Sequence, residues 1–204
     1  MSEEGDMEES DEAADESMVE GEGNVVVIES GDSVILGFTA PLTGEGLAPL
    51  GIDVQRGAEL AVEDRPTVTV GGEEFSVELD VQDGQCSAEG GQAVANRFVS
   101  NPQVVGVVGP LCSSGCTAAA PVYDDAGYSS SSHGCTAPNL STSGFTSFNR
   151  TTPSDASQGA AAAAIIFNEL GVTRIATIHA ASPYGEGLVD VLSEAYVELG
   201  GEVV

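Results

Sequence analysis

The sequence predicts an α/β fold, a doubly wound parallel sheet that forms a first lobe and the start of a second. Two observations carry this prediction. Short apolar runs alternate with amphipathic segments along most of the chain, as in repeated βαβ units. The apolar run Val104 to Val108 ends at Gly109-Pro110 and leads into a Ser- and Gly-rich helix start, which is typical of the strand ends where such sheets bind ligands.

The first lobe contains the regular alternation of strands and helices. Residues 75–81 alternate apolar and polar side chains, which indicates a strand, and residues 51–64 carry apolar side chains at helical spacing. Right-handed crossovers would make the strands parallel and bring their carboxyl ends to one edge. The expected strands are 34–39, 75–81, 104–108 and 128–132, and the expected helices are 51–64, 88–100 and 114–125.

A Ser/Thr/Gly-rich stretch, residues 141–147, indicates a boundary between lobes. Beyond it, Asp155 is a candidate N-cap for an Ala-rich helix to Leu170. A strand over 174–179, a helix over 185–199 and the start of a strand at 202–204 follow. A lobe with barely two strands cannot cover both faces of a sheet, so we expect the chain to be part of a longer protein. The predicted division is an acidic disordered tether (1–31), a ligand-binding lobe one (32–149), and the hinge with the beginning of lobe two (150–204).

The composition is strongly acidic. The formal net charge is −28, from 33 acidic and five basic residues, and all five basic residues are Arg. This charge excludes nucleic acid as a natural partner. Twelve acidic residues fall within residues 1–30, which have no basic residue, and such a segment is expected to be a solvated, disordered tether. No apolar stretch is long enough to cross a bilayer.

The four cysteines, at positions 86, 112, 116 and 135, form no C-x-x-C pair. A metal site is therefore not expected, whereas disulfides are, and disulfides indicate an oxidising compartment. The chain begins Met-Ser-Glu-Glu without the basic and apolar regions of a secretory signal. We expect a leader upstream of this segment or already removed.

Two strand ends form the candidate site. Residues 109–116 follow one buried strand and residues 132–138 follow the next, and both are rich in small polar residues. A helix that starts at such a strand end leaves backbone N–H groups available to a carboxylate or phosphate. No Gly-x-Gly-x-x-Gly follows the first strand, and no acid and base are paired, so we predict binding without catalysis and without a cofactor.

Several short motifs occur in a specific order: Ala40-Pro41-Leu42-Thr43-Gly44, Leu111-Cys112-Ser113-Ser114, Thr136-Ala137-Pro138, Arg150-Thr151-Thr152 and Tyr184-Gly185-Glu186-Gly187-Leu188. In this order the chain resembles the substrate-binding proteins of branched-chain amino-acid ABC transporters, the leucine/isoleucine/valine-binding family of type I periplasmic binding proteins. The resemblance implies two αβ lobes that close on a small solute, an extracytoplasmic location, delivery to a transporter permease, and a possible membrane tether through an upstream N-terminal lipid anchor. The alternative is a ligand-sensing receptor domain of the same fold.

The resemblance also implies residue roles. The α-carboxylate of an aliphatic amino acid would meet Ser113 and Thr136, and the carbonyl of Gly134 would accept from its ammonium group. The remaining implied ligand contacts are Leu111, Cys112 and Cys135 through their backbone, Leu50 toward the ligand side chain, and Tyr184 from lobe two.

The family's disulfide maps onto Cys86 and Cys112. The family's pattern does not assign a partner to Cys116 or Cys135. Cys116 lies one helical turn after Cys112 and Cys135 ends the adjacent strand, so a second bridge between them is geometrically reasonable.

Overall fold

The computed structural model describes residues 26–44 and 46–204, so the predicted tether lies outside the described residues except for positions 26–31. The first lobe runs through β1 (Val34–Ala40), α1 (Ala48–Asp64), β2 (Thr67–Val70), β3 (Glu73–Asp83), α2 (Ala88–Val99), β4 (Val104–Val108), α3 (Ser113–Asp125), β5 (Ser130–Ser132), the 3₁₀ turn η1 (Pro138–Ser141) and β6 (Phe148–Arg150). The second part contains α4 (Asp155–Ala164), the π-helical turn η2 (Ile165–Glu169), β7 (Arg174–Ile175), α5 (Pro183–Glu198) and β8 (Glu202–Val203).

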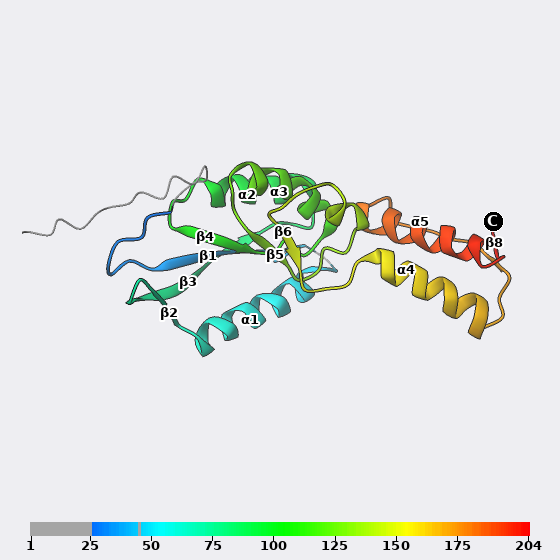
Figure 1. Ribbon diagram of the computed structural model, residues 1–204, viewed down its shortest axis with the longest axis horizontal. Coiled ribbons are helices and arrows are strands. Elements are labelled where there is room, and N and C mark those ends of the chain that lie inside the picture. The colour runs from blue at the N-terminus through cyan, green and yellow to red at the C-terminus, as the bar shows by residue number, and fades with distance from the viewer. Residues whose placement is uncertain (1–25, 45) are drawn as a thin grey trace, which may run out of the picture.

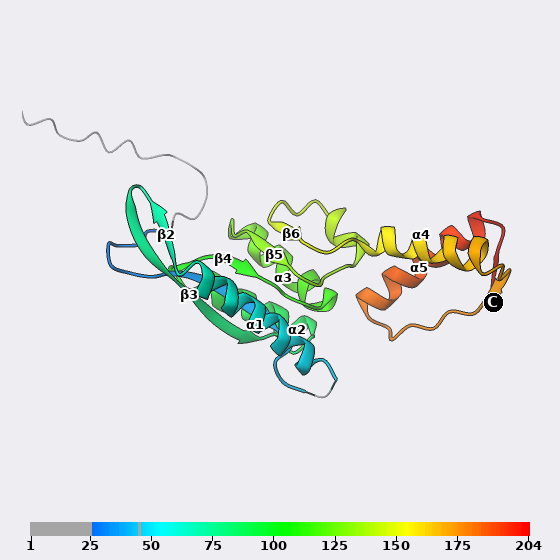
Figure 2. The ribbon, with the colours of Figure 1, turned by 90° about the horizontal axis from the view of Figure 1, so that it is seen from below.

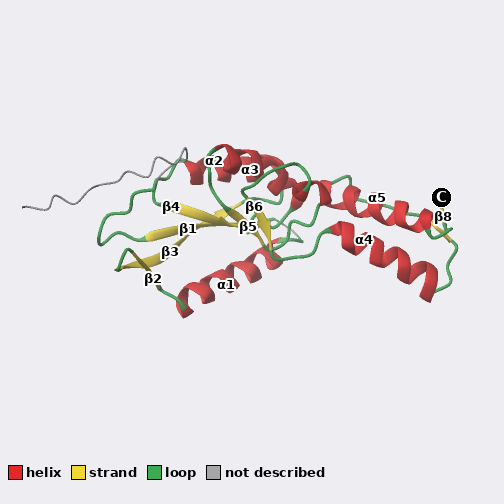
Figure 3. Ribbon diagram, viewed as in Figure 1, coloured by secondary structure: helices red, strands yellow, loops and turns green. Residues whose placement is uncertain are grey.

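The first lobe is built on a six-stranded sheet of order β2-β3-β1-β4-β5-β6. Strands β3, β1, β4, β5 and β6 are mutually parallel, and β2 alone runs antiparallel. Helix α1 covers one face of the sheet, and α2 and α3 cover the other (Figure 1). This confirms the doubly wound α/β fold, and the carboxyl ends of the parallel strands face α4 and α5 (Figure 3).

The β2–β3 hairpin is an element that the sequence prediction missed. Thr67–Val70 pairs antiparallel with Glu73–Ser76, and the turn uses Gly71 and Gly72 with φ values of +62° and +90°. A Gly-Gly pair between two alternating runs is a hairpin signal, because both turn positions need positive φ. The hairpin adds an antiparallel edge to an otherwise parallel sheet.

The main core lies between the sheet and the α2–α3 face. Phe98 of α2, Val104 of β4 and Tyr123 of α3 are fully buried there, and a fully buried side chain of this size contributes about 1.5–3 kcal/mol. A second cluster lies closer to the carboxyl edge of the sheet, where Phe148 packs against it. Its buried members are Cys116, Cys135, Ala137 and Leu140.

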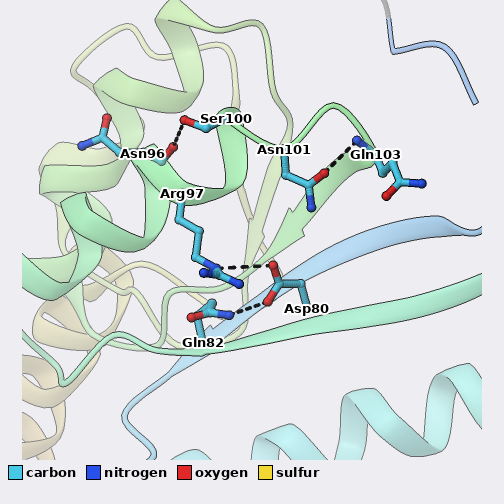
Figure 4. A network of polar contacts seen from close by, with 7 residues as sticks. All are labelled: Asp80, Gln82, Asn96, Arg97, Ser100, Asn101 and Gln103. Carbon is cyan, nitrogen blue, oxygen red and sulfur yellow. Dashed lines mark hydrogen bonds and ion pairs between the residues drawn. The ribbon is translucent and has the colours of Figure 1, made fainter.

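Polar contacts fix α2 at its C-terminal end (Figure 4). Arg97 Nε lies 3.5 Å from Asp80 Oδ2 on β3, and the Gln82 side-chain amide donates to the same carboxylate. The Ser100 hydroxyl donates to Asn96 O at 2.7 Å. The Arg97–Asp80 contact joins α2 to β3, the strand whose following loop carries Cys86.

In the second part, α4 and α5 lie side by side (Figure 2), and β7 pairs with β8 in a two-stranded parallel sheet. The prediction of Asp155 as N-cap is wrong by one residue. Ser154 has the extended cap conformation, and its hydroxyl accepts from Ala156 N–H at 3.3 Å. Asp155 is therefore the first residue inside the helix.

Two boundaries in the second part also differ from the prediction. The helix predicted to Leu170 is α-helical only to Ala164 and ends in the π-helical turn. The strand predicted over 174–179 is two residues long, because the only strand that pairs with it among the described residues, β8, offers two residues. In the described part of the chain, none of the helices is both long and apolar enough to cross a membrane.

Candidate functional site

A cavity of about 460 Å³ lies at the carboxyl edge of the parallel strands. Its walls come from both parts of the chain: the start of α1, the loops after β3 and β4, the start of α3, the end of β5 and the start of α5. No charged side chain lines it, and most of the lining is apolar. The lining residues are Leu47, Leu50, Cys86, Leu111, Cys112, Ser113, Ser114, Gly134, Ser182 and Tyr184.

The polar end of the cavity is the N-terminus of α3. Cys112 is the N-cap residue, in extended conformation and without a side-chain cap, so the first-turn N–H groups of Ser113 and Ser114 have no acceptor within the helix. The partial positive charge of the helix start adds to these donors. The Ser114 hydroxyl donates to Cys86 O at 3.0 Å. An anionic group is the ligand that this end of the cavity favours.

The Ser113 side chain is almost fully buried, with 3% exposed. Its hydroxyl oxygen accepts a hydrogen bond from Ala137 N–H at 3.2 Å. Ser113 therefore joins the start of α3 to the chain that follows β5, in addition to lining the cavity.

The chain that leaves β5, residues 132–137, forms the opposite wall, and we refer to it as the strand-end segment. The Ser132 hydroxyl accepts from the N–H groups of Gly134 (3.2 Å) and Cys135 (2.9 Å). A Cβ atom at Gly134 would lie 2.4 Å from Leu111 Cδ1 and 2.8 Å from Leu111 O. Only glycine allows the strand-end segment to approach the turn after β4 this closely.

Two disulfides join the walls, and both expected bridges are confirmed. Cys86 and Cys112 are bonded with Cα atoms 5.2 Å apart, and Cys116 and Cys135 with Cα atoms 6.4 Å apart. The first links the loop after β3 to the start of α3, and the second links α3 to the strand-end segment.

The apolar wall faces the polar end. Three large side chains line the cavity but remain nearly half exposed: Leu47 (44%), Leu50 (49%) and Tyr184 (46%). They come from α1 and α5, on different parts of the chain. An apolar ligand group between them would cover surface that is now exposed to water.

Asp83, at the end of β3, organises the loop before α1. Its carboxylate accepts from the N–H groups of Leu42 and Gln85, each at 2.9 Å, and from the Thr43 hydroxyl. Partial burial alone would raise the pKa of Asp83, but these hydrogen bonds outweigh it and hold the pKa below its usual value.

Asp155 is fully buried behind the strand-end segment. Desolvation raises its pKa, and the nearby Thr136 hydroxyl and the charge of Arg150 offset only part of this effect. The Thr136 hydroxyl faces the carboxylate without reaching good hydrogen-bond geometry. Burial also lowers the pKa of Arg150, and the charge of Asp155 opposes that shift.

The structure brings most of the predicted ligand residues together around the cavity: Leu50, Leu111, Cys112, Ser113, Gly134 and Tyr184. Cys135 and Thr136 lie behind the lining, Cys135 fully buried in its disulfide. Sequence reasoning missed Leu47, Ser114 and Ser182, and identified Cys86 only as a disulfide partner. Ser114 follows Ser113 at a helix start, so its position was a usable signal.

Comparison with known proteins identifies the family. Residues 54–204 match the model of the receptor family ligand binding region. The chain belongs to this family. An amino acid binding protein of Pseudomonas aeruginosa is 34% identical over 168 residues, which are 82% of this chain and 44% of that protein. The Leu/Ile/Val-binding protein homolog 1 of Brucella abortus is 33% identical over 170 residues, again 82% and 44%.

Among solved structures, a leucine-binding protein of Thermotoga maritima superposes on this ligand-binding region with a TM-score of 0.76 and 28% identity. The match covers 84% of this chain and 47% of that one. These findings confirm the resemblance to leucine/isoleucine/valine-binding proteins. The chain spans about 44% of the length of the curated relatives described above.

Proposed function

We propose that this chain is the ligand-binding part of an extracytoplasmic solute-binding protein, which captures a small amino acid between two lobes and delivers it to an ABC transporter permease. The observation that carries the proposal is the cavity at the strand ends, uncharged and mostly apolar, with the start of α3 at one end. The names of the two curated relatives, an amino-acid-binding and a Leu/Ile/Val-binding protein, support an amino acid as the ligand.

The proposed ligand is an aliphatic amino acid. Its α-carboxylate would lie against the N–H groups of Ser113 and Ser114, with the hydroxyl of Ser113 and the backbone N–H of Thr136 nearby. Hydrogen bonds to a charged group in such a place are stronger than neutral ones. The carbonyl of Gly134 would accept from the ammonium group. The aliphatic side chain would lie among the leucines and Tyr184, where burial of apolar surface favours it.

Binding without chemical conversion is part of the proposal. Both disulfides together use all four cysteines of the chain, so no thiolate is available as a nucleophile. Among the described residues, no group of three or more His, Cys, Asp or Glu side chains could hold a metal ion. The relatives are named as binding proteins.

The proposed location is outside the cytoplasm, because two disulfides persist in an oxidising compartment. The acidic segment 1–31 would serve as a tether, and residues near Arg150 as the hinge about which the lobes close. A ligand that contacts both lobes favours the closed state.

Calorimetry of the whole gene product against a panel of amino acids tests the proposal. We expect an aliphatic amino acid to bind unchanged. Ser113→Ala should weaken binding about ten- to a hundredfold, since a hydrogen bond to a charged group contributes about 1.5–3 kcal/mol. Leu60→Ala, an exposed substitution on α1 outside the cavity lining, is the control. Turnover of the ligand, or unchanged affinity in the Ser113 variant, would contradict the assignment.

A further inference from the structure

The strand-end segment needs partners to hold its shape. Beyond Ser132 it belongs to no strand or helix, yet it carries three of the proposed ligand contacts. In irregular backbone the direction of each peptide group is set by individual hydrogen bonds rather than by a regular ladder. The partners of its carbonyl groups therefore determine where its N–H groups point.

Those partners come from the end of β6 and the start of α4. Arg150 Nη1 donates to Cys135 O at 3.3 Å and to Ala137 O at 3.1 Å, and its Nη2 donates to the Ser141 hydroxyl. Asp155 N–H donates to Thr136 O at 2.9 Å. Three successive carbonyl groups of the segment are thus held by residues at the end of β6 and the start of α4.

The N–H groups of the same peptide units point the other way. In a trans peptide the N–H is directed opposite to the preceding carbonyl, and the only cis bond among the described residues is Gly109-Pro110. The peptide between Thr136 and Ala137 follows this rule, since its carbonyl meets Asp155 and its N–H reaches Ser113 on α3. The preceding peptide, held by Arg150 at Cys135 O, directs Thr136 N–H away from Arg150.

Thr136 N–H has no hydrogen-bond acceptor within the described residues. We propose that Arg150 is a positioning residue for ligand binding: by holding the carbonyls of Cys135 and Ala137, it aims Thr136 N–H at the α-carboxylate of the ligand. The proposal rests on the proposed function and adds to it a residue that lines no part of the cavity.

The chemistry of this position requires arginine. A guanidinium group presents several donors in one rigid plane and so reaches two carbonyls and a hydroxyl together, whereas an ammonium group is a single point of charge. The guanidinium carbon lies over the Phe148 ring, 5.8 Å from the ring centre. Asp155 supplies the opposite charge within the buried region.

The experiment measures leucine binding and backbone amide signals in the whole gene product. Arg150→Met should weaken leucine binding about tenfold or more, because one charge-assisted hydrogen bond to the carboxylate is lost. In ¹⁵N–¹H spectra, leucine should shift the Thr136 amide of the wild type strongly. In Arg150→Met that shift should be lost, while the Ser113 amide still responds. Arg174→Met, which removes an exposed ion pair with Glu202, is the matched control and should behave as the wild type.

Arg150→Lys provides a second test if Arg150→Met does not fold, since it keeps the charge but reaches fewer acceptors. It should fold and show a reduced Thr136 shift with intermediate affinity. Wild-type affinity in Arg150→Lys together with an unchanged Thr136 shift would overturn the proposal, as would binding by folded Arg150→Met within about twofold of the wild type. If the wild type binds no amino acid, the proposed function fails, and the role of Arg150 fails with it. If the wild type binds and the variants bind equally, only the role of Arg150 fails.

Discussion

The two disulfides can be removed one at a time, and the two losses of folding stability can then be compared. Loop entropy and the burial of the cysteine side chains predict opposite orders for these losses. The Cys116–Cys135 bridge closes 19 residues and the Cys86–Cys112 bridge closes 26. Loop entropy predicts that each bridge stabilises the folded state by about 3 kcal/mol, and that the bridge with the longer loop contributes only about 0.3 kcal/mol more. Burial reverses this order, because Cys116 and Cys135 are 1% and 0% exposed within an apolar cluster. Their replacement also leaves a cavity, which adds on the order of 1 kcal/mol.

We therefore expect the Cys116→Ala/Cys135→Ala variant to lose about 4 kcal/mol and the Cys86→Ala/Cys112→Ala variant about 3 kcal/mol. Urea unfolding of the oxidised proteins, followed by far-UV circular dichroism, measures both. Each variant is the control for the other, because each keeps one bridge. A larger loss in the Cys86/Cys112 variant, or losses below about 1 kcal/mol in both, would refute the reasoning.

The stability contributions of Asp83 and Asp155 should depend on pH in opposite directions, because the pKa of Asp83 is lowered in the folded state and that of Asp155 is raised. Asp83 has a folded-state pKa below its unfolded value of 3.8, so its contribution is present above that pH and is lost as the pH falls through the folded-state pKa. Asp83→Asn should lower the free energy of unfolding at pH 7 by about 1 kcal/mol, and urea titrations should show the difference narrowing in acid. Asp155 has a folded-state pKa above 3.8, so the stability associated with its neutral form is present below 3.8 and is lost as the pH rises through the folded-state pKa. The stability of the wild type relative to Asp155→Asn should therefore fall as the pH rises through the folded-state pKa of Asp155, and a difference in urea midpoint that does not change with pH would contradict this.

Patterns of neighbouring residues were sufficient to predict those parts of the site that are formed by one continuous stretch of the chain. The apolar run of β4 followed by Gly-Pro and two serines predicted the strand, the turn and the start of α3, because all three depend on neighbouring residues. Gly134 and Ser113 were assigned through resemblance, and the structure brings both to the cavity wall.

Residues that act through distant contacts could not be predicted in the same way. Ser182 and Leu47 reach the cavity only because α5 and α1 begin at its rim, which no local pattern indicates. The side chain of Arg150 reaches back across 13 to 15 residues to its carbonyl partners. The π-helical turn after Ala164 likewise has no clear signature in the Ala-rich sequence before it.

The two cystines connect the loops after β3 and β5 in series through the first turn of α3, so half of the cavity wall is one cross-linked unit. That unit holds the groups that would meet the charged ends common to all amino acids. The other half of the wall has no covalent restraint and would meet the part of the ligand that varies. Substitution there can change which ligand is preferred without disturbing the recognition of its charged ends, so redesign of ligand preference should begin with the uncross-linked residues Leu47, Leu50, Ser182 and Tyr184.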